Sequence, residues 1–277
     1  MDTGVDKLQA AQKVILKDDL KRYIDLNTDF GQSRDTAFFN RTNHKLLTSV
    51  SSVNIPCCVH DGDPKDVMDN IAKAKSFNCA IGAHIGYPDP ANYGYEAMAI
   101  SKEELQAWLY VQVGGFRAMI QSMGLDIEHI RPHGALYTSF LDNPDVAMTV
   151  AETLNKIDPW ITLVAPVGPI LQGIQEKMEL RTAPEVYLGK RYGRDGVIVK
   201  DRMYDTLPPH ATLEQAKTLI QDSKLTLQDG QRVDVQFSSI HISPTMADSC
   251  ELAEKIYQML EQPVPVSIAA VGSSGWL

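Results

Sequence analysis

The stretch VNIPCCVHDGDPKDVMDNIAKAKSFNCAIGAHIGYPD (residues 53–89) decides the fold class of this chain. It begins with an apolar run, part of a strand predicted over residues 51–59, and ends with another, over residues 79–84. Between them, Asp63 and Pro64 form an N-cap followed by proline at the first helical position, which predicts a helix over residues 64–77. A strand, a helix and a strand in this order predict two parallel strands joined by a helical crossover.

The same alternation continues on both sides of this stretch. Further strands are predicted over residues 23–27, 127–133, 161–166, 183–189, 235–243 and 266–271, and further helices over residues 101–124, 143–157, 168–180, 210–223 and 246–260. This pattern favours a closed or nearly closed β/α barrel over an open doubly wound sheet. We predict an N-terminal helix or arm over residues 1–22 and a single barrel domain over residues 23–277.

Composition and charge exclude several function classes. The formal net charge is −9 and no block of Lys and Arg is present, which argues against nucleic acid or an anionic membrane as a partner. No apolar run has the length of a membrane span, and the first twenty residues lack the apolar core of a signal peptide, so we expect a cytoplasmic protein. The four cysteines are predicted to be free thiols, with Cys57 and Cys58 on opposite faces of a strand.

Polar residues gather where the predicted strands end. Asp25, Asn27 and Asp29 alternate along the first strand, so all three point the same way. The later strands carry the remaining candidates, which are His60, Asp63, His84, Arg131, His133, Glu185 and His241. In a β/α barrel the active site lies at the carboxyl ends of the strands, so these side chains are predicted to line one pocket.

Two kinds of chemistry fit histidines and carboxylates that converge from different strands. One is a divalent metal held by imidazole and carboxylate with an open position for water. The other is acid–base chemistry without a metal. No local spacing of the H-E-x-x-H type separates the two. The segment 92–98, which contains Tyr93 and Tyr95, is predicted to be a loop that covers the barrel mouth.

Taken together, four motifs resemble those of the LamB/YcsF family, which contains one subunit of the bacterial ATP-dependent 5-oxoprolinase. These motifs are DLNTDFG (25–31), NIPCCVHDGDP (54–64), IGAHIGYPD (81–89) and RPHGALY (131–137), in the same order as in the family. Weaker similarity is found in EVYLGKRYGRDG (185–196) and IHISPTMA (240–247). The resemblance covers nearly everything from Tyr23 to the C-terminal helix.

The resemblance implies a seven-stranded β/α barrel, related to deacetylase-type barrels that place Asp and His around a metal. It also implies ring opening of a cyclic amide with ATP, in partnership with two other subunits. The catalytic residues implied are Asp25, Asp29, His60, His84 and His133. The substrate-binding residues implied are Asn27, Asp63, Arg131, Tyr137, Glu185 and Tyr95. A metal, if one is used, would be held by Asp29, His60 and His84.

Several positions depart from the family pattern. An acidic residue after the first motif is Gln32 here, two paired arginines are replaced by Tyr95 and Glu96, and an acidic–basic pair reads Gly189 and Lys190. The aspartate of a late H-G-D motif is Ser243. These changes remove charged groups that phosphoryl chemistry would use, so we expect ATP dependence to be lost or altered.

The sequence leaves three functions open. The first is an enzyme that hydrolyses a small lactam or related amide, a C–N bond hydrolase. The second keeps the pocket for non-hydrolytic acid–base chemistry, as in a cyclase, an isomerase or a lyase. The third is a non-catalytic ligand-binding subunit. Three alternating polar residues on an inward face are costly unless they are paired or wet, which favours a functional pocket.

Overall fold

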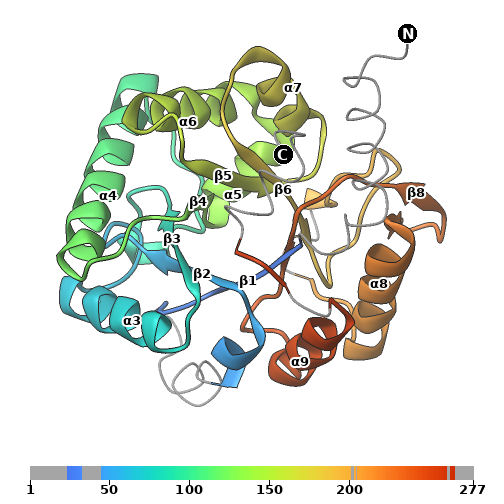
Figure 1. Ribbon diagram of the computed structural model, residues 1–277. Coiled ribbons are helices and arrows are strands. Elements are labelled where there is room, and N and C mark those ends of the chain that lie inside the picture. The colour runs from blue at the N-terminus through green and yellow to red at the C-terminus, as the bar shows by residue number, and fades with distance from the viewer. Residues whose placement is uncertain (1–23, 33–44, 201–202, 204, 261–262, 266–277) are drawn as a thin grey trace, which may run out of the picture.

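A closed barrel of seven parallel strands forms the centre of the molecule in the computed structural model (Figure 1). The structure describes residues 24–32, 45–200, 203, 205–260 and 263–265. Within these residues the barrel strands are β1 (Asp25–Asp29), β2 (Ser52–Pro56), β3 (Ala80–Ile85), β4 (His129–Pro132), β5 (Thr162–Pro166), β6 (Thr182–Tyr187) and β9 (Ser239–His241). The prediction of a seven-stranded β/α barrel is confirmed.

Helices surround the barrel, and most of them lie between two barrel strands in the chain. They are α3 (Pro64–Ser76), α4 (Lys102–Ser122), α5 (Gly134–Asp142), α6 (Pro144–Ile157), α7 (Pro169–Lys177), α8 (Pro209–Asp222) and α9 (Ser249–Met259). Two short 3-10 helices, η3 (Leu47–Ser49) and η4 (Pro90–Asn92), lie in the loops. Figure 1 shows the large helices as an outer ring around the strands, so the outward strand faces are covered.

Local sequence signals explain where the helices begin. Asp63 caps α3 by accepting a hydrogen bond from the Lys65 backbone N–H at 2.8 Å. Ser101 and Glu104 form a reciprocal capping box at the start of α4. Each cap satisfies backbone donors that a helix start leaves without an intrahelical partner, which fixes the loop that precedes the helix.

Strand register brings the three polar residues of β1 into the barrel. Asn27 pairs with Ser52 of β2 and with His241 of β9, so β1 lies between the second strand and the last described strand. Asp25, Asn27 and Asp29 are all buried, and each bonds to side chains from other barrel strands. The predicted inward orientation of these residues is therefore confirmed.

Two local expectations lie outside the described residues, and two elements of the structure were not predicted. The eighth strand candidate, residues 266–271, and the N-terminal arm, residues 1–22, lie outside the described residues. Residues 134–142 form helix α5, which was not predicted from the sequence. Between α8 and β9 the chain forms an antiparallel hairpin of β7 (Lys224–Thr226) and β8 (Arg232–Asp234), which was also not predicted.

The strand predicted over residues 51–59 is too long. Strand β2 ends at Pro56, and Cys58 has a φ of 61°, in the left-handed region. Cys57 and Cys58 therefore do not occupy opposite faces of a strand, because the chain has already turned into the loop that carries His60. All four cysteines are free, as predicted.

Candidate active site

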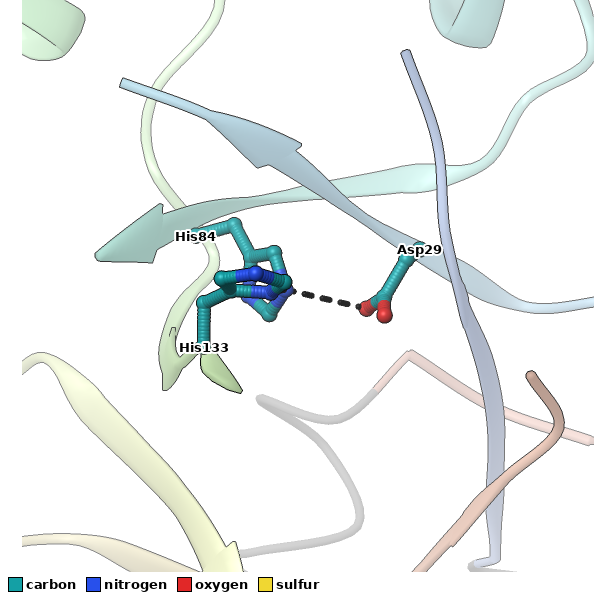
Figure 2. Close-up of side chains that lie close together, drawn as sticks. All are labelled: Asp29, His84 and His133. Atoms are coloured by element: carbon teal, nitrogen blue, oxygen red, sulfur yellow. Dashed lines mark hydrogen bonds and ion pairs between the residues drawn. The ribbon is translucent and has the colours of Figure 1, made fainter. Parts of the chain in front are cut away.

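Three side chains from three strands meet at the carboxyl end of the barrel (Figure 2). Asp29 ends β1, His84 lies near the end of β3, and His133 directly follows β4. The Nε2 atom of His84 is 3.3 Å from Asp29 Oδ1 and 2.9 Å from His133 Nδ1. Both imidazoles are buried, and the Asp29 side chain is 10% exposed. We call Asp29, His84 and His133 the Asp–His cluster.

Backbone carbonyls determine which nitrogen of each imidazole carries the proton. The Nδ1 atom of His84 lies 3.0 Å from the Arg131 carbonyl oxygen, and the Nε2 atom of His133 lies 2.9 Å from the Tyr93 carbonyl oxygen. A carbonyl can only accept, so these two ring nitrogens are the N–H donors. The other two ring nitrogens, His84 Nε2 and His133 Nδ1, face each other, and His84 Nε2 also faces the Asp29 carboxylate.

The charge state of the cluster follows from burial and from its neighbours. Burial, reinforced by the nearby His84, lowers the pKa of His133 to about 3, so His133 is neutral at pH 7. Burial opposes ionisation of Asp29, but His84, His241 and Arg131 outweigh it and hold the pKa of this carboxyl well below its usual range. An ionised carboxylate with two imidazole nitrogens close by attracts a cation, either a proton or a metal ion.

The donor atoms of the cluster are of the kind and spacing that can bind a divalent metal ion. The donor atoms of Asp29, His84 and His133 all lie within 4.8 Å of one another. Histidine ligands are commonly oriented by a carbonyl on the opposite ring nitrogen, as both imidazoles are here. Two imidazole nitrogens and one carboxylate form a donor set typical of catalytic zinc-type sites.

His60 lies beside this donor set. Its ring stacks on that of His133, with centroids 4.4 Å apart and planes 12° from parallel. Both ring nitrogens are buried and have no hydrogen-bond partner among the described residues. Burial and the adjacent His133 hold the pKa of His60 well below its usual range, so this imidazole is neutral. The structure groups His133, rather than His60, with Asp29 and His84.

A buried ion pair forms the wall of the site. Glu185 on β6 accepts hydrogen bonds from Arg131 Nε at 2.9 Å and from Arg131 Nη2 at 2.8 Å, and it also accepts from Tyr137 and Asn27. Arg131 Nη1 lies 3.3 Å from Asp29 Oδ1. Burial opposes ionisation of Glu185, yet Arg131 lowers its pKa to about 2. The predicted anion-binding group Arg131 is therefore occupied by two carboxylates of the protein itself.

Two asparagines and two histidines connect the strands beneath the cluster. Asn54 on β2 donates to Asp29 Oδ1 at 3.0 Å and to Asn27 Oδ1 at 2.9 Å. His129 Nε2 lies 2.7 Å from Asn54 Oδ1, and His241 Nδ1 lies 2.7 Å from Asn27 Oδ1. The network holds Asp29 in place from β2 and β9.

A glycine on β3 makes room for this network. A Cβ atom added to Gly82 would lie 2.1 Å from the His129 Nε2 atom, closer than any real contact. Neither His129 nor Asn54 was predicted as a site residue from the sequence. The available signal was the alternation of His129, Arg131 and His133, which places all three on one strand face.

Asp25 and Asp63 lie apart from the cluster. Asp25 begins β1 at the opposite end of the barrel, where Ser51, Ser52 and Ser239 donate hydrogen bonds to it. Burial raises the pKa of Asp25 to about 6 despite these three hydroxyl donors. Asp63 is exposed and caps α3. The structure therefore does not bring Asp25 and Asp63 together with the cluster, whereas catalysis and substrate binding were predicted for them.

The loop after β3 covers the cluster. The Tyr95 ring lies edge-on to His133, with centroids 4.8 Å apart, and Tyr93 supplies the carbonyl that orients His133. Gln32 also reaches His133, with its Nε2 atom 3.1 Å from Nδ1. An amide donor at this position favours the neutral imidazole.

Fold and site together define a β/α-barrel protein with an Asp–His centre at the carboxyl ends of its strands. The chain belongs to the LamB/YcsF family, whose model matches residues 24–272. A 5-oxoprolinase subunit of Pseudomonas syringae pv. tomato is 30% identical over 243 residues, 87% of this chain and 94% of the relative. The corresponding 5-oxoprolinase subunit of Haemophilus influenzae is 32% identical over 246 residues, 86% of this chain and 96% of the relative.

Solved structures agree with this assignment. The crystal structure of the lactam utilization protein from Thermus thermophilus matches with a TM-score of 0.78 and 29% identity, over 88% of this chain and 99% of that one. A putative cellobiose-phosphate cleavage protein from Enterococcus faecalis matches with a TM-score of 0.50 and 14% identity, over 91% of this chain and 94% of that one, which shows a shared fold alone. Among the described residues, no helix is both long and apolar enough to span a membrane.

Proposed function

We propose that this protein is an enzyme component that opens a small lactam by hydrolysis, with the Asp–His cluster as its reaction centre. The observation that carries the proposal is the position of His84 Nε2, which faces both His133 Nδ1 and an ionised Asp29. The names of the relatives, 5-oxoprolinase subunits and a lactam utilization protein, support a cyclic amide as the substrate class.

The proposed reaction assigns a proton path to His84. Its Nε2 atom takes a proton from water while the water oxygen bonds to the lactam carbonyl carbon, and Asp29 stabilises the resulting imidazolium. His84 then returns this proton to the ring nitrogen as the C–N bond breaks, which releases a free amino group and a carboxylate. The N–H contact of His84 to the Arg131 carbonyl holds the ring in the orientation that both steps need.

A divalent metal held by Asp29, His84 and His133 is the alternative to this proton path, because the Nε2 lone pair of His84 would then bind the metal and could not accept a proton. When bound, such an ion supplies polarisation of the amide carbonyl and a more acidic water. His60, without a partner on either nitrogen among the described residues, would then be the remaining neutral imidazole beside the centre.

We also propose that this protein works with partner subunits and that its dependence on ATP is lost or altered. The similar bacterial proteins are each named as one subunit of a 5-oxoprolinase, which supports assembly with others. Tyr95 and Glu96 stand where the family carries paired arginines, and Ser243 stands where it carries an aspartate. These changes support a ring opening that depends less on phosphoryl transfer.

Turnover of lactams tests the proposal. We would measure 5-oxoproline and 2-pyrrolidinone hydrolysis by the wild type and by His133→Ala, with and without ATP and the partner subunits of a 5-oxoprolinase. His210→Ala, an exposed histidine at the start of α8, is the matched control. We expect the rate of lactam hydrolysis to fall about a hundredfold or more in His133→Ala, which should stay folded. The rate of the control should be unchanged.

Two results would contradict the proposal in different ways. If a folded His133→Ala variant hydrolyses lactams at the wild-type rate, the Asp–His cluster is not the reaction centre. No turnover of any lactam by the wild type under all four conditions would refute the substrate class.

A further inference from the structure

Lys190 follows strand β6 at the same end of the barrel as the Asp–His cluster, and its backbone is held rigidly. Gln215 of α8 accepts a hydrogen bond from the Gly189 N–H at 2.8 Å and donates to the Lys190 carbonyl at 3.0 Å. Gly189 has a φ of 75°, and a Cβ atom there would lie 2.7 Å from Met246. These contacts fix the position of the Lys190 backbone at this end of the barrel.

The amine of Lys190 is buried without a carboxylate in direct contact. The residue is 4% exposed, and in the described part of the chain no carboxylate oxygen lies within 4 Å of its nitrogen. The amine donates to the Asp205 carbonyl at 3.3 Å and lies 4.9 Å from the centre of the Tyr187 ring. Burial, opposed only in part by the charge of Asp205, lowers the pKa of Lys190 to about 8, so the amine is still mostly protonated at pH 7.

Two aromatic rings, Tyr187 and His241, connect this ammonium to Asp29 of the reaction centre. The half-buried Tyr187 ring lies edge-on to His241 with centroids 4.4 Å apart, and His241 Nε2 lies 3.7 Å from Asp29 Oδ2. Arg131 is the other cation next to Tyr187, with its guanidinium carbon 5.6 Å from the ring centre. Arg131 is already paired with Glu185 and Asp29. Lys190 is thus the cation at this edge that forms no ion pair with a described carboxylate.

We propose that Lys190 binds the carboxylate of an anionic lactam and so determines the preference for substrates that carry an acidic group. A buried ammonium is costly without an anionic partner, and a ligand carboxylate would supply one. A lactam lying on the Tyr187 ring would direct its amide to the Asp–His cluster and its carboxylate to Lys190. This inference rests on the proposed function and adds to it the charge of the substrate.

Binding measurements test this inference separately from catalysis. Isothermal titration calorimetry would compare 5-oxoproline, which has a carboxylate, with 2-pyrrolidinone, which has the same ring without it. The proteins are the full-length wild type, Lys190→Met, Lys190→Arg and the control Lys217→Met, a partly exposed lysine on α8 paired with Glu214. A charge-assisted hydrogen bond predicts that the wild type binds 5-oxoproline about tenfold to hundredfold more tightly than 2-pyrrolidinone.

The variants decide the role of the amine. We expect Lys190→Met to bind both lactams with the same Kd, Lys190→Arg to keep part of the preference, and Lys217→Met to match the wild type. A preference that survives in Lys190→Met, or equal binding of both lactams by the wild type, overturns the inference and leaves the proposed function standing. Failure of the wild type to bind either lactam overturns both.

Discussion

Replacement of Glu185 by glutamine should destabilise the protein strongly, although the two side chains have nearly the same shape. Glu185 is fully buried and accepts hydrogen bonds from Arg131, Tyr137 and Asn27. A glutamine keeps one acceptor oxygen but turns an NH₂ group toward these donors. It also removes the charge that balances Arg131, which is equally buried.

The size of this effect can be worked out from the pKa of Glu185. A pKa of about 2 in the folded protein against 4.5 in the unfolded chain corresponds to about 3 kcal/mol of stability. Because the folded pKa is the lower one, this stability is present above pH 4.5 and is lost as the pH falls toward 2. Glutamine mimics the uncharged form, so about 3 to 5 kcal/mol should be lost at about pH 7.5.

Urea unfolding followed by circular dichroism at about pH 7.5 measures this loss. Glu176→Gln, an exposed residue on α7, is the matched control and should change the free energy of unfolding by less than about 0.5 kcal/mol. The double variant Arg131→Met with Glu185→Leu should lose less than the sum of the two single variants, because each single change leaves a buried charge unpaired. A Glu185→Gln variant as stable as the control, or additive effects in the double variant, would refute the ion-pair reasoning.

Two further predictions follow from the carboxylates of β1. Burial raises the pKa of Asp25 from 3.8 to about 6. Ionised Asp25 therefore destabilises the folded protein, an effect that is absent below about pH 4 and grows as the pH rises through 6. Urea unfolding should therefore show Asp25→Asn gaining about 3 kcal/mol relative to the wild type between about pH 4 and pH 7, and parallel pH profiles would contradict this. Elemental mass spectrometry separates the proton path from the metal-bound alternative, which predicts a divalent metal at one equivalent in the wild type, lost in Asp29→Ala and His133→Ala but retained in His60→Ala. Loss of metal in His60→Ala with retention in His133→Ala would instead support the ligand set predicted from the sequence.

The barrel and most of the site could be predicted because they depend on short-range patterns. Alternation along β1 places Asp25, Asn27 and Asp29 on one face whatever the rest of the chain does. Parallel strands bring their carboxyl ends together, so His84 and His133 had to lie near Asp29 once the β/α alternation was recognised.

The roles within the site depend on contacts that a strand pattern does not contain. Asp25 and Asp29 share a face, but they lie at opposite ends of a five-residue strand, and only Asp29 reaches the carboxyl end. Cys58 adopts a left-handed backbone two residues before His60, and the His60 ring stacks on the face of His133. The proton positions on His84 and His133 depend on the carbonyls of Arg131 and Tyr93, whose places only tertiary structure defines.

The strongest test of lactam hydrolysis at the Asp–His cluster is the origin of the oxygen in the product. Incubation of the protein, with its partner subunits and 5-oxoproline, in water enriched in ¹⁸O is followed by mass spectrometry of the product. Hydrolysis at the cluster predicts a ring-opened amino acid with one oxygen from water in its new carboxylate, formed by the wild type and by His210→Ala but not by His133→Ala. A product of unchanged mass, without ¹⁸O, would contradict hydrolysis and indicate an isomerisation on the same barrel.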